Sequence, residues 1–131
     1  MAINVKYIVE SSKSVAQAQA DLEAAVKRHG FGVLHSYDLK QTLNSKGIDF
    51  GNECRILEIC NPQQAKKVLD NDMSMNMALP CRLSVYAEEG KTKIGMISPK
   101  AMLQALSDSP ELKRIADEVE TATMKMIDEA K

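Results

Sequence analysis

The fold is decided by residues 54–97, which read CRILEICNPQQAKKVLDNDMSMNMALPCRLSVYAEEGKTKIGMI. Residues 55–60 are apolar enough to form a strand in the middle of a sheet. Asn61 and Pro62 then predict the start of a helix, because the Asn side chain caps free backbone N–H groups and proline has no N–H to leave unpaired. This part of the stretch therefore predicts a strand that leads directly into a helix.

The second half of the same stretch predicts a β-hairpin. A methionine-rich link precedes Pro80, and proline is tolerated where a strand opens because no N–H donor is needed there. Residues 83–87 alternate between apolar and polar side chains, residues 91–97 form the second arm, and Glu89-Gly90 supply the turn.

The N-terminal part predicts a strand followed by a helix. Residues from Ile3 to Val9 alternate, as expected for a strand with one buried face. Ser14 and Gln17 form an S-x-x-Q capping box at the start of a helix, and Gly30 is placed to end that helix.

Residues 31–38 predict a second strand and a short helix. The strand covers 31–37 and would place four side chains on one face: Phe31, Val33, His35 and Tyr37. Asp38 then begins a D-x-x-Q helix start, and Gly47 ends the helix.

The C-terminal part predicts two more helices. Ser98-Pro99 and Ser109-Pro110 repeat the cap-then-proline start. The order of elements is then β-α-β-α-β-α-β-β-α-α, without an internal repeat or a linker. We expect residues 1–131 to form a single α+β domain, a two-layer sandwich in which helices pack on one face of a mostly antiparallel or mixed sheet of about five strands.

The composition favours a soluble cytoplasmic protein. With 17 basic and 18 acidic residues the formal net charge is −1, so the concentrated positive surface that nucleic-acid binding needs is not expected. No apolar run approaches the roughly 20 residues that span a bilayer, and no secretory signal is recognised, so we expect no membrane association. An odd number of cysteines, three, indicates reduced thiols in the cytoplasm.

Four segments carry a family resemblance: HGFGVLHSYDLKQTLNSKGIDF, CRILEICNPQQAKKVLDND, LPCRLSVYAEEGKTKIGMISP and the amphipathic C-terminal helix. The most specific parts are Glu58-x-Cys60-Asn61-Pro62 and Pro80-Cys81-Arg82-x-x-Val85-Tyr86. Together, over roughly residues 4–130, they resemble the domain of unknown function 302 family. The resemblance implies a small cytoplasmic α+β protein that forms a homodimer. It implies no reaction, so no catalytic residue is carried over.

The candidate ligand site consists of Cys60, Cys81, Glu58 and Arg82. Cys60 precedes the capping Asn61, so the positive end of the following helix would lower the pKa of its thiol and favour a thiolate. The alternative is that both cysteines are small buried apolar residues. Glu58, a carboxylate in an apolar strand, needs a partner, which Arg55 or Arg82 could supply.

The candidate metal site combines Cys60, Cys81 and His35. These are ligands for zinc or another thiophilic metal, and zinc takes four ligands, or three and a water. The cysteines form no C-x-x-C pair, so the spacing alone gives this interpretation weak support.

Two functions follow from these residues. The first is a homodimeric protein that binds a small, unidentified ligand or a metal near Cys60, Cys81 and Glu58. The second is a thiol-dependent enzyme or redox protein that uses Cys60 with Cys81 as its partner. The residues alone do not decide between them, and they do not decide whether a reaction is catalysed.

Overall fold

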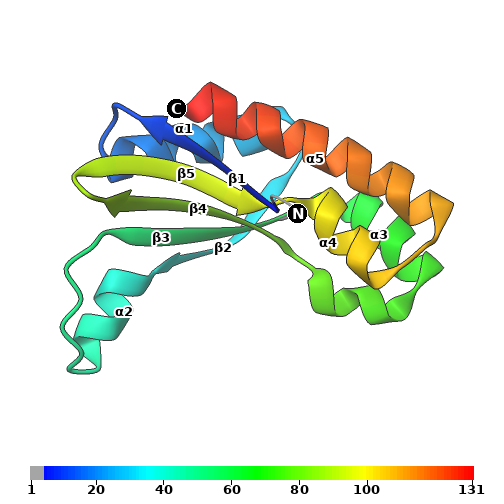
Figure 1. The fold of residues 1–131 in the computed structure, drawn as a ribbon, viewed down its shortest axis with the longest axis horizontal. Helices are drawn as coiled ribbons and strands as arrows, with labels where there is room; N and C mark the ends of the chain where they lie inside the picture. Colours follow the sequence, from blue (N-terminus) through cyan, green and yellow to red (C-terminus); the bar gives the residue numbers. More distant parts are fainter. Residues whose placement is uncertain (1–4) are drawn as a thin grey trace, which may run out of the picture.

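A five-stranded antiparallel sheet organises the molecule, as a computed structural model that describes residues 5–131 shows (Figure 1). The strand order is β1-β5-β4-β3-β2, so the hairpin supplies the middle of the sheet and the N-terminal strand lies at one edge. The strands are β1 (Lys6–Ser11), β2 (Gly32–Asp38), β3 (Cys54–Cys60), β4 (Cys81–Glu88) and β5 (Lys91–Ile97). The expected α+β architecture is confirmed, and every strand pair is antiparallel.

The helices form the second layer. They are α1 (Val15–Arg28), α2 (Leu39–Ser45), α3 (Pro62–Asn71), α4 (Pro99–Leu106) and α5 (Pro110–Ala130), with the 3-10 helix η1 (Met73–Ala78) in the methionine-rich link. The long helices α1 and α5 pack against each other and cover one face of the sheet, while α3 and α4 pack against α5 (Figure 1). None of these helices is both long and apolar enough to span a bilayer.

The helix starts follow the capping residues of the sequence. Ser14 accepts a hydrogen bond from the N–H of Gln17, and Asp38 caps α2 in the same way. Asn61, Ser98 and Ser109 cap the three helices that begin with proline. These bonds lie within one helical turn, which is why the start of each helix was predictable from the chain alone.

The core lies between the sheet and the helices α1 and α5. On β3, β4 and β5 every second side chain points into it, as a half-buried strand requires. These side chains are fully buried together with those of the two helices: Leu57, Ile59, Leu83, Val85, Ile94, Leu22, Val26, Leu112, Met126 and Ile127. The opposite face of the sheet therefore carries the alternate residues and is left uncovered by α1 and α5.

A bulge in β2 corrects one expectation. Val33 pairs with Ile59 on the core side, but the register shifts at Leu34, and His35 then pairs with Glu58. The four side chains expected on one face are therefore divided, because the extra residue reverses the alternation. Phe31 and Val33 lie on the helix side, whereas His35 and Tyr37 lie on the uncovered face.

The first strand begins later than expected. The expectation covered residues 3–9, of which residues 3 and 4 lie outside the described residues, and β1 runs on to Ser11. The hairpin turn is confirmed: Glu89 and Gly90 both have positive φ, 53° and 75°, as the favoured two-residue turn requires.

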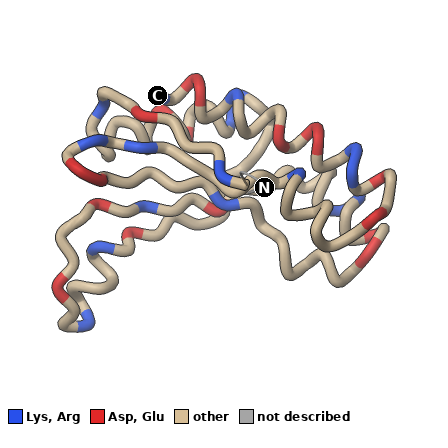
Figure 2. Tube along the Cα trace, viewed as in Figure 1, with Lys and Arg blue, Asp and Glu red and all other residues tan. Residues whose placement is uncertain are grey.

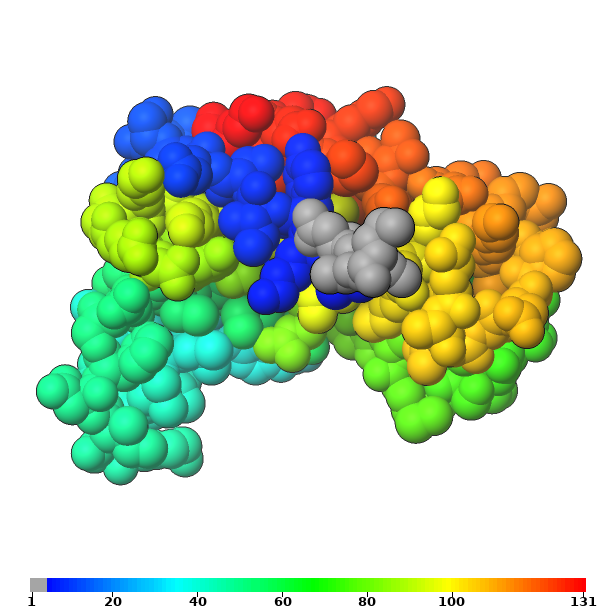
Figure 3. All heavy atoms as spheres, in the orientation of Figure 1, coloured from blue at the N-terminus to red at the C-terminus, as the bar shows by residue number. Residues whose placement is uncertain are grey.

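The uncovered face, which we call the open face, lies between two projections of the chain. One consists of α2 and the loop that follows it, and the other of α3 and η1. Their outlines leave an indentation at the lower edge of the space-filling view (Figure 3). Residues of both charges occur along the trace on the side of α2, whereas η1 carries no charged residue (Figure 2).

Candidate ligand-binding site

A row of five residues crosses the middle of the open face, one from each strand. In register order they are Ile8, Gly95, Ser84, Ile56 and Tyr37. Residues paired across antiparallel strands share a face and lie side by side. Gly95 and Ser84 have the smallest side chains of the row. The surface is therefore low at these two residues and higher at Ile8, Ile56 and Tyr37.

The next row carries the charges. Glu58 of β3 lies between His35 of β2 and Arg82 of β4, and Lys6 pairs with Ile97 across β1 and β5. This second row lies nearer the end of the sheet, where β4 begins and β5 ends. The charged groups therefore stand beside the low centre formed by glycine and serine.

A cavity of about 640 Å³ occupies this part of the open face. The members of the two rows on β1, β5, β4 and β3 line it, whereas Tyr37 and His35 of β2 lie outside it. It is also lined by Tyr86, by the segment leading into β4, by the start of α4 and by Thr123 of α5. The lining residues from this segment and from the start of α4 are Met77, Ala78, Leu79, Pro80, Pro99 and Met102. The cavity thus has a mostly apolar wall, and its charged residues are Lys6, Glu58 and Arg82.

Tyr37 is the partner of Glu58. Its hydroxyl donates a hydrogen bond of 2.7 Å to Glu58 Oε1, and the bond raises the pKa of Tyr37 because it would be lost with the phenol proton. The expected arginine partner is therefore wrong. Arg55 lies on the other face, where it bonds Gln19.

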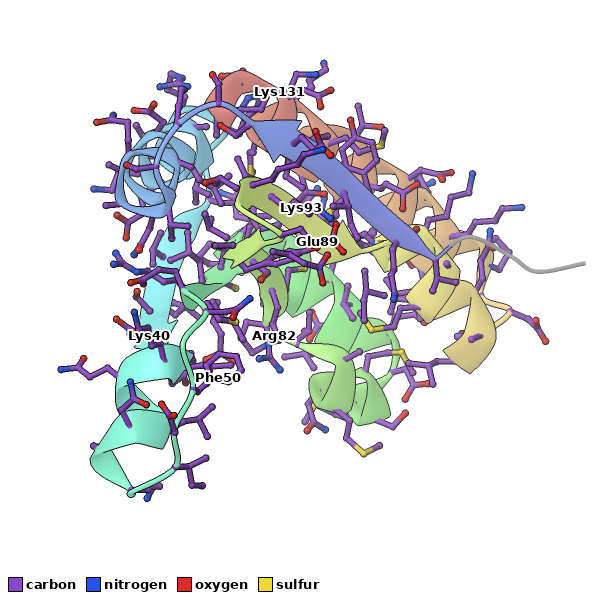
Figure 4. All side chains as sticks on the ribbon, turned by 60° about the vertical axis from the view of Figure 1, so that its left-hand side comes forward. Lys40, Phe50, Arg82, Glu89, Lys93 and Lys131 are labelled. Carbon is purple, nitrogen blue, oxygen red and sulfur yellow. The ribbon has the colours of Figure 1, made fainter. Side chains whose placement is uncertain are left out.

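Arg82 has an uncompensated guanidinium. Within residues 5–131 it forms no hydrogen bond or ion pair, although it faces Glu58 in the register. The positive charge of Arg82 still lowers the pKa of Tyr37, but the opposite effect of Glu58 on that pKa is larger. Figure 4 shows its side chain pointing away from α1 and α5, into the space between α2 and the coils of residues 62–78.

Cys60 and Cys81 come together, but below the open face. Cys81 pairs with Ile59, and both thiols line a second, internal cavity of about 40 Å³ between the end of the sheet and the helices α3, α4 and α5. Cys81 also borders the open-face cavity. It therefore belongs to the wall that separates the two cavities.

Neither thiol is activated. Burial raises the pKa of Cys60, contrary to the expectation that the helix after Asn61 would lower it. Burial and the neighbouring Cys60 raise the pKa of Cys81 to about 11. Desolvation acts on the whole thiolate charge, whereas a helix end offers only a partial charge, so burial dominates here.

The expected metal ligands are not assembled. His35 lies on the open face opposite Glu58, whereas Cys81 faces the helices. Within residues 5–131 no group of three or more His, Cys, Asp or Glu side chains is placed to hold a metal ion. A zinc site in a single copy of this chain would lack the three or four ligands that zinc requires.

Sequence reasoning missed Gly95 and Ser84, which line the centre of the cavity, and Tyr37, which bonds Glu58 from outside it. A signal was present for Gly95, because a glycine inside a strand often marks a close approach of another backbone. Here Ile8 of β1 lies over it. Ser84 and Tyr37 had no such signal, since their positions depend on strand pairing and on the bulge.

Comparison with known proteins places the chain in a family. The model of the domain of unknown function DUF302 matches residues 7–130. The chain belongs to the DUF302 family. It is also similar to a solved structure, "uncharacterized conserved protein DUF302 from Bacillus stearothermophilus", with 36% identity and a TM-score of 0.93, over 98% of this chain and 100% of that one. No curated protein matches the chain.

The DUF302 match confirms the resemblance that the motifs around Cys60 and Cys81 carried. It adds the fold as a shared property, because the match to the solved structure covers the sheet and all the helices. The family is one of unknown function, so the chemistry of the open-face cavity has to be argued from its own residues.

Proposed function

We propose that this DUF302 protein binds a small organic molecule in the open-face cavity. The supporting observation is the low centre of the face, where Gly95 and Ser84 are surrounded by larger side chains. The volume lies within the range of roughly 300–1,000 Å³ typical of ligand sites. Apolar walls with a few polar groups, here Glu58 and Arg82, are also typical of such sites.

A cavity-filling variant tests this proposal. Ser84→Phe puts an aromatic ring into the low centre, so small neutral probes such as 1-octanol and indole should lose their binding. Ser12→Phe, at an exposed position outside the cavity, is the matched control. Binding is measured by the movement of backbone amide resonances, above all those of Ser84 and Gly95. If no small organic probe, neutral or charged, moves these resonances in the unaltered protein, the proposal is wrong.

We also propose that the ligand-binding form is a homodimer in the cytoplasm. The open face exposes Ile8, Tyr37 and Ile97, which a second copy would cover. An isologous contact is the commonest way for identical chains to pair. The cytoplasmic location is supported by three cysteines without disulfides, which suit a reducing compartment.

A charge introduced on the open face tests the dimer. Ile97→Glu should give a monomer in sedimentation equilibrium at micromolar concentration, because a carboxylate in the contact would lose its water. The control is Leu106→Glu at the end of α4, since Leu106 is 53% exposed and Ile97 57%. A monomeric unaltered protein, or a dimer that survives Ile97→Glu unchanged, would refute the proposed contact.

The metal-binding form and the thiol-dependent enzyme have less support. Among residues 5–131, no third metal ligand stands near Cys60 and Cys81, and burial raises the pKa of both thiols. A redox exchange between the two thiols is favoured only by their shared position at the internal cavity. Elemental analysis of protein purified without metal-affinity resin tests for bound metal. The pH dependence of Cys60 alkylation tests the thiol-dependent enzyme.

A further inference from the structure

We infer that the open-face cavity takes an amphiphilic monoanion, a molecule with one carboxylate and an apolar body. This inference rests on the proposed function and names its class of ligand. Arg82 binds the carboxylate, and the apolar body lies against the low centre and the wall beyond it. Three features support this choice: the guanidinium of Arg82, the hydrogen bond that holds Glu58, and the apolar wall.

The guanidinium of Arg82 favours an anion. It contributes a positive charge to the lining, whereas Glu58, the carboxylate of the lining, is held by Tyr37. Arg82 has no hydrogen-bond or ion-pair partner among residues 5–131, so all of its N–H donors are available. A guanidinium presents these donors as a planar fork that fits a carboxylate with two parallel hydrogen bonds.

The Tyr37–Glu58 hydrogen bond keeps Arg82 available. Glu58 faces Arg82 across β3 and β4, the position in which an ion pair would be expected. However, Tyr37 stands on the other neighbour of β3, the edge strand β2, and its hydroxyl holds Glu58 Oε1. The carboxylate is thereby held toward β2. Tyr37 is a positioning residue, because it acts on the ligand through Glu58.

The wall favours an apolar body. The chain entering β4 and the start of α4 contribute Met77, Leu79 and Met102, and the sheet contributes Ile8 and Ile56. Methionine side chains are unbranched and adapt to irregular shapes. A small inorganic anion would leave this apolar surface in water, whereas an amphiphile covers it.

Three probes with the same chain and different head groups test the inference. Octanoate, 1-octanol and octyltrimethylammonium are titrated into the unaltered protein at low salt, and binding is followed through the Ser84 and Gly95 amide resonances. Octanoate should bind tightest and the cation weakest. Arg82→Met keeps much of the side chain and removes the charge, and it should weaken octanoate by roughly 10- to 100-fold, since a charge-assisted hydrogen bond is lost. Octanol should be unaffected.

Arg114→Met is the matched control for Arg82→Met. Arg114 lies on α5, is also exposed, has no hydrogen-bond or ion-pair partner among the described residues and lies outside the cavity. The control loses the same charge, so it separates direct contact from an effect of net charge. Equal weakening of octanoate by both variants would overturn the role of Arg82.

Two variants test the positioning role of Tyr37. Tyr37→Phe releases Glu58 toward Arg82 and should weaken octanoate several-fold without changing octanol. Adding Glu58→Gln to Tyr37→Phe should restore octanoate binding, because the competing carboxylate is gone. A merely structural role for Tyr37 would give no such restoration, and that result would overturn this step.

The outcomes distinguish a failure of the inferred anion from a failure of the proposed small-molecule binding. If octanol binds as tightly as octanoate and Arg82→Met has no effect, the cavity binds small molecules but the choice of an anion is wrong. If the cation binds tightest, Glu58 dominates the cavity and the inference is overturned. If no probe moves the Ser84 and Gly95 resonances, both the inference and the proposed function are wrong.

Discussion

Ile8 lies over Gly95 at the pairing of β1 with β5, so closely that a Cβ added to Gly95 would stand 3.0 Å from Ile8 Cγ1. The same Cβ would stand 3.1 Å from the carbonyl oxygen of Tyr7. The oxygen belongs to the backbone and cannot rotate aside. Glycine at this position therefore permits the close approach of the edge strand and keeps the centre of the open face low.

Gly95→Ala should destabilise the protein. The added methyl group overpacks a close contact, and such overpacking costs about 1–3 kcal/mol. Gly51→Ala is the matched control, because a Cβ there meets nothing within 4 Å. Urea unfolding measures both free energies. A loss for Gly95→Ala no greater than that for Gly51→Ala would show that the β1–β5 contact relaxes freely.

The Cys81 thiol should make stability fall at high pH. Its pKa is raised from an ordinary 9.0 to about 11, so between these values the unfolded chain loses the thiol proton and the folded chain keeps it. The contribution is complete below pH 9 and is lost as the pH approaches 11. A rise of about two in the pKa of Cys81 corresponds to about 3 kcal/mol of stability. Urea unfolding at pH 8 and pH 10.5 measures it.

Cys81→Val is the comparison for this pH dependence. The variant keeps a small apolar side chain and removes the titrating group, so its stability should fall less between the two pH values. Lysines and tyrosines titrate in both proteins and cancel in the difference. Identical slopes would mean that the thiol ionises as easily in the folded protein as in the unfolded chain.

Glu58→Gln should lower the pKa of Tyr37. The carboxylate accepts the phenol hydrogen bond and its charge opposes ionisation, and both effects raise the pKa in the unaltered protein. Ultraviolet difference titration of the tyrosines follows it. Tyr7, whose pKa is raised by its hydrogen bond to Asp128, is an internal reference that the variant should not move. An unchanged titration curve would refute the coupling.

Asn61→Ala should cost about 1 kcal/mol of stability, within the range of about 0.5–2 that N-caps give. The Asn61 side chain accepts hydrogen bonds from the N–H groups of Gln63 and Gln64, at 3.1 and 3.2 Å, and the variant leaves both donors without it. Gln63→Ala in the exposed first turn of the same helix is the control. Thermal or urea unfolding distinguishes the two, and equal stabilities would show that solvent replaces the cap.

The order of elements was predictable because its signals are local. Asn61, Ser98 and Ser109 act within one turn, and the positive φ angles of Glu89 and Gly90 depend on the turn itself. The alternation of side chains along β3 and β4 also predicts which residues of these strands face the core. The family resemblance then agreed with the same segments.

The cavity was not predictable in the same way. Gly95, Ser84 and Ile56 meet only through the register of three strands, and no pattern along the chain fixes that register. Glu58 and Arg82, which the sequence singled out, both line the cavity, but the Tyr37 partner of Glu58 depends on the bulge. The candidate metal ligands were chosen by residue type alone. In the structure His35 lies on the open face, whereas Cys81 faces the helices.

The bulge at Leu34 places one extra residue in β2 without a partner on β3. Before it, Val33 contributes to the interior, and after it His35 and Tyr37 are presented outward. Because Val33 and His35 pair with the consecutive residues Ile59 and Glu58, deletion of Leu34 would leave a regular alternation that keeps His35 and Tyr37 outward. The bulge therefore lets β2 hold one extra residue without moving the Tyr37 hydroxyl away from Glu58.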